Sequence, residues 1–121
     1  MKKILIIEDE VALQKMLGEV LAEKGYEVIQ SLDGESGLAL AISGKPDLIL
    51  LDLILPKIKG LGVLKKIREN EIIKDTPVII LTNSENAADI EEAISLGTTT
   101  YLVKANYSIK EIMEKVEKIW K

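Results

Sequence analysis

The sequence contains no cysteine and no histidine in its 121 residues. Without cysteine, the chain cannot form a disulfide, a thiolate nucleophile or a cysteine-based zinc site. Without histidine, it lacks the most common general base, most catalytic triads and most transition-metal sites. Any chemistry in this chain must therefore use carboxylates, hydroxyls, amides and lysines, with or without a hard cation.

Two further features are missing: an excess of basic residues and a long apolar segment. The net charge is −4, which argues against the broad basic face that nucleic-acid binding needs. The longest apolar stretches are far shorter than a membrane span, and nothing after Met1 resembles a signal peptide. We therefore expect a cytoplasmic protein with no direct nucleic-acid partner and no membrane partner.

The composition that remains is that of an ordinary globular domain. Apolar residues make up 47% and charged residues 30% of the chain. A chain of this length commonly folds around one core, and we find no repeat, linker or low-complexity segment. We therefore expect residues 1–121 to form a single domain.

Five short β-rich segments alternate with helical patterns along the chain. The predicted strands are Lys3–Ile7, Tyr26–Ser31, Leu48–Leu51, Val78–Leu81 and Thr100–Val103. The first, third and fourth are apolar throughout, as expected for strands covered on both faces of a parallel sheet. The second is mixed and flanked by polar residues, which is typical of an edge strand.

Helical patterns occupy the segments between and after these strands. The predicted helices are Val11–Lys24, Gly34–Ser43, Leu61–Glu69, Ala87–Leu96 and a final one with an apolar stripe of Ile109, Ile112, Met113, Val116, Ile119 and Trp120. Ser108 and Glu111 predict a capping box at the start of the final helix. The strict alternation predicts a doubly wound α/β domain with a five-stranded parallel sheet of order 2-1-3-4-5.

Polar residues follow four of the predicted strands, and function in such sheets gathers at the carboxyl ends of the strands. Glu8, Asp9 and Glu10 follow the first strand, and Asp52 follows the third. Thr82, Asn83 and Ser84 follow the fourth strand, and Lys104 follows the fifth. These four strands are neighbours in the predicted order, so we expect their end groups to converge on one crevice.

Three of these groups, the carboxylates of Glu8, Asp9 and Asp52, would repel one another. Each pair about 4 Å apart repels by roughly 4 kcal/mol at an effective dielectric constant near 20. Protons or a cation must neutralise the cluster, and an all-oxygen site selects a hard ion, Mg²⁺ before Ca²⁺. A divalent ion together with Lys104 would balance the three negative charges.

Each of these residues also has an ordinary structural explanation when taken alone. Glu8 or Asp9 could stabilise the start of the following helix, and Asp52 could be a loop residue. Thr82 could be a cap, a lone lysine is usually solvated, and we interpret Glu10 as a solvated carboxylate in the first turn of a helix. The coincidence of polar groups at four neighbouring strand ends is what favours a functional site.

The segments IIEDE, LLDLILPKIKG, IILTNS and YLVKANYS together resemble a receiver domain of a two-component response regulator. The resemblance covers essentially the whole chain, and the spacing of Asp52, Pro56 and Gly60 before an amphipathic helix is specific. It implies the flavodoxin-like receiver fold and a phosphoacceptor function, with Asp52 as the phosphorylated aspartate. The chain would then be a signalling domain rather than a turnover enzyme.

The resemblance implies a metal site as well. Glu8 and Asp9 would be the acidic pair that binds Mg²⁺ (or Mn²⁺), with Asp9 a direct ligand and Glu8 acting largely through water. Asp52 and the backbone carbonyl of Ile54 would complete the protein's share of the metal shell.

A phosphorylation switch is the third implication of the resemblance. Thr82 and Lys104 would hold the phosphoryl oxygens, and Tyr101 would be the aromatic residue whose rotamer reports activation. The surface that changes would comprise the fourth helix, the fifth strand and the fifth helix. The implied donor is a sensor histidine kinase or a histidine phosphotransfer protein, and the implied target is a downstream protein; a phosphorylation-dependent homodimer is left open.

The sequence departs from the family at three positions. Ala105 follows the site lysine where proline is usual, commonly after a cis peptide, so the bond here is either trans or strained. Lys59 replaces a typically acidic residue, and Asn83 replaces a typically small one. The side chains of Ile54 and Ser84 tend to set how fast water reaches the acyl phosphate, and apolar Ile54 predicts slow self-dephosphorylation.

Three other interpretations compete with this one. A haloacid-dehalogenase-like phosphatase also uses an aspartyl phosphate, Mg²⁺, threonine and lysine, but its nucleophile follows the first strand, whereas Asp52 follows the third. A flavodoxin-like flavin binder would need a phosphate-binding loop after the first strand, where this chain is acidic. A degenerate receiver that serves only as an interaction module would lack a site residue, and all of them are present in this sequence.

Overall fold

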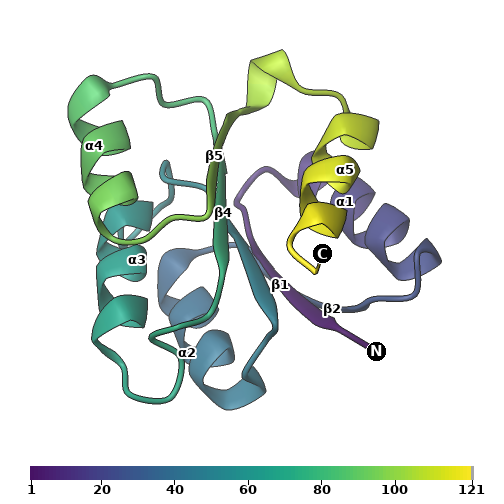
Figure 1. Cartoon of the computed structure of the whole chain (residues 1–121), viewed down its shortest axis with the longest axis horizontal. Helices are drawn as coiled ribbons and strands as arrows, with labels where there is room; N and C mark the ends of the chain where they lie inside the picture. Colours follow the sequence, from purple (N-terminus) through teal and green to yellow (C-terminus); the bar gives the residue numbers. More distant parts are fainter. Residues whose placement is uncertain (121) are drawn as a thin grey trace.

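The computed structural model describes residues 1–120 and confirms the predicted alternation of strands and helices (Figure 1). The strands are β1 (Lys3–Ile7), β2 (Glu27–Ser31), β3 (Leu48–Leu51), β4 (Val78–Thr82) and β5 (Thr100–Val103). The helices are α1 (Val11–Glu23), α2 (Gly34–Gly44), α3 (Gly60–Glu69), α4 (Ala87–Ser95) and α5 (Ile109–Lys118), with a 3₁₀ helix, η1 (Lys104–Asn106), between β5 and α5. Within residues 1–120, no helix is long and apolar enough to cross a membrane.

The five strands form one parallel sheet in the predicted order β2-β1-β3-β4-β5. Helices α1 and α5 cover one face, and α2, α3 and α4 cover the other (Figure 1). This is the predicted doubly wound arrangement, and β2 lies at an edge as expected. The order places the carboxyl ends of β1, β3, β4 and β5 side by side.

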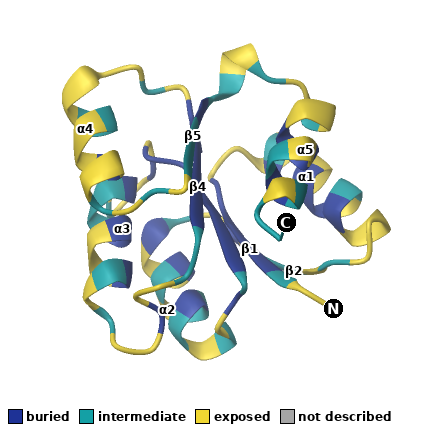
Figure 2. Cartoon of the chain, in the orientation of Figure 1, coloured by how far each residue is buried: buried dark blue, intermediate teal, exposed yellow. Residues whose placement is uncertain are grey.

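The two faces of the sheet carry separate halves of the core (Figure 2). In β1, Leu5 and Ile7 pack with the residues of α2 and α3, whereas Ile4 and Ile6 pack with those of α1 and α5. Every residue of β3 and β4 is buried. Full burial of each such side chain contributes about 1.5–3 kcal/mol, so the central strands are a firm base for the groups at their ends.

The ends of the strands and of the first four helices differ from the prediction by one residue at most, whereas α5 ends at Lys118, two residues before the end of its predicted apolar stripe. Tertiary pairing explains one of these differences. Strand β4 continues to Thr82 because that residue pairs with Val103 of β5. The capping box at α5 is confirmed: Ser108 Oγ accepts from the N–H of Glu111 at 3.2 Å, and the Ser108 N–H donates to Glu111 Oε1 at 2.9 Å.

Candidate functional site

Asp52 is the first residue after β3, at the carboxyl edge of the sheet. Its side chain is 3% exposed, and its backbone N–H donates to the carbonyl of Ile7 at 3.0 Å, which extends the ladder past the strand. Oδ1 of Asp52 accepts a hydrogen bond from the N–H of Ile54 at 3.0 Å. The carboxylate is therefore buried, and the backbone holds one of its two oxygens.

The loop after Asp52 folds closely back on itself at Gly60. The N–H of Gly60 donates to the carbonyl of Leu53 at 3.0 Å. A Cβ at this position would overlap the carbonyl oxygen of Asp52 and the Cα of Leu53. This close backbone approach is the physical reason why the Asp52–Gly60 spacing ends in glycine.

Lys104 lies opposite Asp52, at the end of β5. Its Nζ is 2.9 Å from Asp52 Oδ2 and 2.7 Å from Glu8 Oε1, and its side chain is 12% exposed. Burial by itself lowers the pKa of the ammonium group, but hydrogen bonds to Glu8 and Asp52 outweigh burial and raise the pKa of Lys104 above its ordinary value. The Lys104–Ala105 peptide is trans, because residues 1–120 contain no cis bond.

Glu8, Asp9 and Asp52 form the predicted carboxylate cluster. One carboxylate oxygen from each lies within 4.8 Å of the others. Burial raises the pKa of Glu8 to about 7, against the opposing hydrogen bonds from Lys104 and from the N–H of Glu10. One lysine cannot neutralise three carboxylates, so this all-oxygen donor set fits a hard divalent ion such as Mg²⁺.

Glu10 contacts the site, which the interpretation as a solvated carboxylate misses. Its Oε1 lies 3.4 Å from Lys104 Nζ, while 58% of its side chain is exposed. Glu10 occupies the N-cap position of α1, yet its side chain accepts no capping hydrogen bond. No pattern in the sequence separates this orientation from a fully solvated one.

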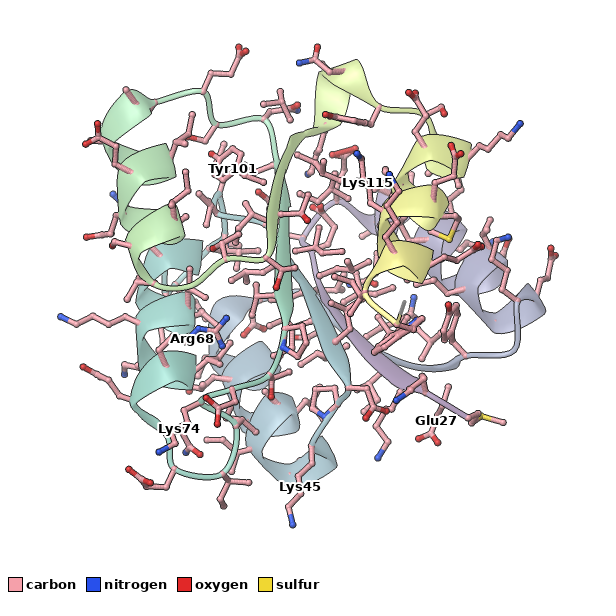
Figure 3. All side chains as sticks on the ribbon, viewed as in Figure 1. Glu27, Lys45, Arg68, Lys74, Tyr101 and Lys115 are labelled. Atoms are coloured by element: carbon pink, nitrogen blue, oxygen red, sulfur yellow. The ribbon has the colours of Figure 1, made fainter. Side chains whose placement is uncertain are left out.

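Thr82, Ser84 and Tyr101 form a chain of hydrogen bonds beside the carboxylates. Thr82 is fully buried, and its Oγ1 accepts from the N–H of Ser84 at 3.2 Å. The carbonyl of Ser84 accepts from the Tyr101 hydroxyl at 2.8 Å, and Ser84 Oγ donates to Asp89 of α4 at 3.0 Å. Figure 3 shows Tyr101 on the side of β5 that faces α4, and burial raises the pKa of its hydroxyl. The sequence identifies Thr82 and Tyr101 but does not reveal that Ser84 links them.

Gln14 is a supporting residue that the sequence interpretation misses. Its buried Nε2 donates to the carbonyls of Ile6 at 3.1 Å and Glu8 at 3.2 Å. The same nitrogen donates to the carbonyl of Ser31 at 2.7 Å. Gln14 therefore ties the loop that carries the acidic pair to the end of β2. The only signal in the sequence is a polar residue between the apolar positions of a helix.

The site groups surround a small open cavity of about 260 Å³, lined by Asp9, Glu10, Asp52, Ile54, Asn83 and Lys104. Ile54 and Asn83 are exposed at its rim. A larger hollow of about 680 Å³ lies between α1 and β2, and its lining includes none of the three clustered carboxylates. Residues that follow all four predicted strands line the smaller cavity, which is therefore the candidate site.

The fold and the site together define a class of protein: small α/β domains with a buried aspartate paired to a lysine at the carboxyl edge of a parallel sheet. Residues 4–117 match the response regulator receiver domain family. The chain belongs to this family. Receiver domains are the phosphoacceptor domains of two-component signalling, so the resemblance inferred from the motifs is confirmed.

Individual relatives agree with this membership. The chain is 36% identical to the transcriptional regulatory protein DltR of Streptococcus agalactiae serotype III over 114 residues, which cover 94% of this chain and 50% of DltR. Its structure is similar to the chemotaxis protein CheY4 of Vibrio cholerae (TM-score 0.89, 28% identity, 98% of both chains). It is also similar to the Mn²⁺-bound form of response regulator Rcp1 (TM-score 0.83, 35% identity, 98% of this chain and 91% of that one). The chain spans about half the length of the curated relatives it matches.

Proposed function

We propose that Asp52 accepts a phosphoryl group from a phosphohistidine on a sensor histidine kinase or a histidine phosphotransfer protein. The observation that carries the proposal is the position of Lys104 Nζ, 2.9 Å from the buried Asp52 and 2.7 Å from Glu8. A carboxylate can attack phosphorus in line when its charge is offset and the phosphoryl oxygens are held. The chain has no histidine, so it would be the acceptor and not the donor.

In the transfer, a carboxylate oxygen of Asp52 bonds to phosphorus while the P–N bond of the phosphohistidine breaks. The electron pair of that bond stays on the imidazole nitrogen, which takes up a proton. Lys104 would donate to one phosphoryl oxygen, and the hydroxyl of Thr82 would donate to another.

The residues that would hold Mg²⁺ (or Mn²⁺) are Glu8, Asp9, Asp52 and Ile54, the last through its backbone carbonyl. A bound ion would offset the charge of the nucleophile and of the phosphoryl oxygens. The approach of the three carboxylates to within 4.8 Å supports this assignment. The Mn²⁺-bound form of the related Rcp1 supports it as well.

Phosphorylation would switch the surface formed by α4, β5 and α5. The charge at Asp52 would change from −1 to about −2. Thr82 would turn toward the phosphoryl group and release the N–H of Ser84, whose carbonyl holds the Tyr101 hydroxyl. The rearranged surface would then bind a downstream protein or a second copy of the chain.

Residues 1–121 would form a single receiver domain that signals rather than turns over a substrate. Its curated relatives are about twice as long, and DltR is named as a transcriptional regulatory protein. We therefore include a transcriptional output in the proposal. Contact with nucleic acid would lie outside this receiver, whose net charge is −4.

Incubation with acetyl phosphate and Mg²⁺ tests the proposal. The wild type should gain the mass of one phosphoryl group in intact-mass spectrometry, and Asp52→Ala should gain none. Asp75→Ala removes an exposed carboxylate in the loop before β4 and should behave as the wild type. If the wild type gains no phosphoryl mass, the proposal is wrong.

The phosphoryl group should also be long-lived, because the apolar side chain of Ile54 stands at the rim of the cavity through which water must arrive. We expect a half-life of minutes or longer in the isolated domain and a shorter one in Ile54→Asn, which can orient a water molecule. The decay of the phosphorylated mass with time measures both. A half-life of only a few seconds in the wild type would contradict this expectation.

A further inference from the structure

Glu10 is the one carboxylate at this site that the proposed phosphoryl transfer leaves without a role. Its backbone N–H donates to Glu8 Oε2 at 2.9 Å, so the main chain at this residue is held against the acidic cluster. Its side chain does not cap α1 and lies instead 3.4 Å from Lys104 Nζ, at the rim of the cavity.

Lys104 has as many carboxylate neighbours as it has N–H donors. The ammonium group offers three donors, and its neighbours are Glu8 at 2.7 Å, Asp52 at 2.9 Å and Glu10 at 3.4 Å. A phosphoryl oxygen can reach Lys104 only when one of these contacts is released. The contact with Glu10 is the longest, and Glu10 is 58% exposed whereas the other two acids are buried. By distance and exposure, it is therefore the weakest of the three contacts.

The charge count at the site points in the same direction. Glu8, Asp9, Glu10 and Asp52 carry four negative charges, whereas Lys104 and a divalent ion carry three positive ones. The excess negative charge lies on Glu10 at the open rim, where an incoming phosphoryl donor passes. A small dianionic donor meets this charge directly, whereas a protein that carries phosphohistidine can place a cation against it.

We infer that Glu10 is a positioning and specificity-determining residue for phosphoryl transfer. It holds the third donor of Lys104 until the phosphoryl group arrives, and it disfavours small dianionic phosphoryl donors relative to a phosphohistidine on a protein. This inference rests on the proposed function of Asp52.

Two small donors that differ in charge separate this role from a purely structural one. Acetyl phosphate is a dianion at pH 7.5, and it transfers its phosphoryl group to Asp52 as the P–O bond breaks and acetate leaves with the electron pair. Phosphoramidate carries one negative charge less, and its P–N bond breaks as ammonia leaves. With Mg²⁺ at low ionic strength, Glu10→Gln should accept phosphoryl from acetyl phosphate about fivefold faster than the wild type. The gain should be smaller with phosphoramidate, and it should fade as salt screens the charge.

Two control variants accompany this comparison. Glu10→Asp keeps the charge and should stay close to the wild-type rate. Glu19→Gln makes the same change of net charge at an exposed position further along α1 and should leave both rates unchanged.

The outcomes separate the inference from the function on which it rests. If the wild type is phosphorylated but Glu10→Gln is not faster, the inference is wrong and the function of Asp52 stands. A gain that is equal for both donors and insensitive to salt also overturns it, because a charge effect must depend on both. If the wild type accepts phosphoryl from neither donor, the proposed function fails and the inference fails with it.

Discussion

Two cationic side chains, Lys104 and Arg68, join distant segments of this fold in opposite ways. Within residues 1–120, the ammonium group of Lys104 is paired only with carboxylates, those of Glu8, Glu10 and Asp52. Arg68, near the end of α3 (Figure 3), contacts only backbone carbonyls in the described part of the chain. Burial lowers the pKa of Arg68, whereas the carboxylates raise the pKa of Lys104 despite its burial.

The Arg68 junction uses all three guanidinium nitrogens. Nε donates to the carbonyl of Leu96 at 2.6 Å, and Nη2 donates to that of Gly97 at 3.0 Å. Nη1 donates to the carbonyls of Thr76 at 2.7 Å and Lys74 at 3.0 Å. These bonds hold the C-terminal end of α4 and the loop before β4 against α3, so this end of α4 is anchored.

The difference lies in the charge of the acceptors. Backbone carbonyls carry no charge that a proton or a metal ion could neutralise, so the junction should not respond to either. The carboxylates around Lys104 leave excess negative charge in a buried place, which a proton or a metal ion can neutralise and a phosphoryl group would increase. A rigid junction and a responsive site thus use the same kind of contact with different acceptors.

The largest expected effect is at the junction. Arg68→Ala should lower the free energy of unfolding by about 3 kcal/mol, because several hydrogen bonds from a charged donor are lost and their carbonyls are left without it. Urea unfolding monitored by circular dichroism measures this, with exposed Lys66→Ala as a control expected within about 0.5 kcal/mol of the wild type. The loss should be the same with and without Mg²⁺; a loss that depends on Mg²⁺ would remove the contrast with Lys104.

By contrast, the loss of stability caused by Lys104→Met should depend on the metal ion. In EDTA at pH 7.5 we expect a loss of about 2 kcal/mol, since the buried Glu8 and Asp52 lose their cation. Saturating Mg²⁺ should reduce this loss, because the ion neutralises the same carboxylates. Paired urea titrations with EDTA and with Mg²⁺ measure the difference, and an unchanged loss would show that the site does not respond as described.

The pH dependence of stability also distinguishes the Lys104 site from the Arg68 junction, and its effect on the free energy of unfolding should be smaller than those of the two substitutions above. The folded-state pKa of Glu8, about 7, exceeds its ordinary value of 4.5, so the folded chain binds this proton more tightly than the unfolded chain. The free energy of unfolding of the metal-free protein should therefore fall as the pH rises from about 4.5 to about 7. Glu8→Gln should flatten this decline, as unfolding at several pH values would show, whereas Arg68→Ala should leave its slope unchanged.

The smallest expected effect concerns the backbone of the site loop. Lys57 has φ 67°, a left-handed conformation that asparagine tolerates better than lysine. Lys57→Asn should raise the free energy of unfolding by about 0.5 kcal/mol. The matched variant Lys57→Ala shortens the same side chain without easing the left-handed conformation and should bring no gain. Equal effects of the two variants in urea unfolding would rule out relief of strain.

Much of the fold and of the site is predictable because each strand can be recognised from its own short segment of sequence. The apolar segments of β1, β3 and β4 predict buried parallel strands, and their order brings the strand ends together. Asp52 and Lys104 are identified because each directly follows a strand. By contrast, the acceptors of Arg68 are backbone carbonyls, which every residue has. No pattern of residue types can therefore predict which carbonyls accept its hydrogen bonds.

Sequence alone determined the alternation of elements, the parallel sheet and the positions at which carboxylates and the lysine meet its edge. Those features follow from hydrophobic periodicity and from short-range rules of chain connection. Tertiary structure decided which groups share a proton or a donor: Glu10 with Lys104, Ser84 with Tyr101, and Gln14 with the end of β2. These contacts depend on side-chain directions and on distances of a few ångströms between residues far apart in the chain. Hydrophobic periodicity does not specify distances of a few ångströms between side chains, but these distances determine hydrogen bonds and pKa values.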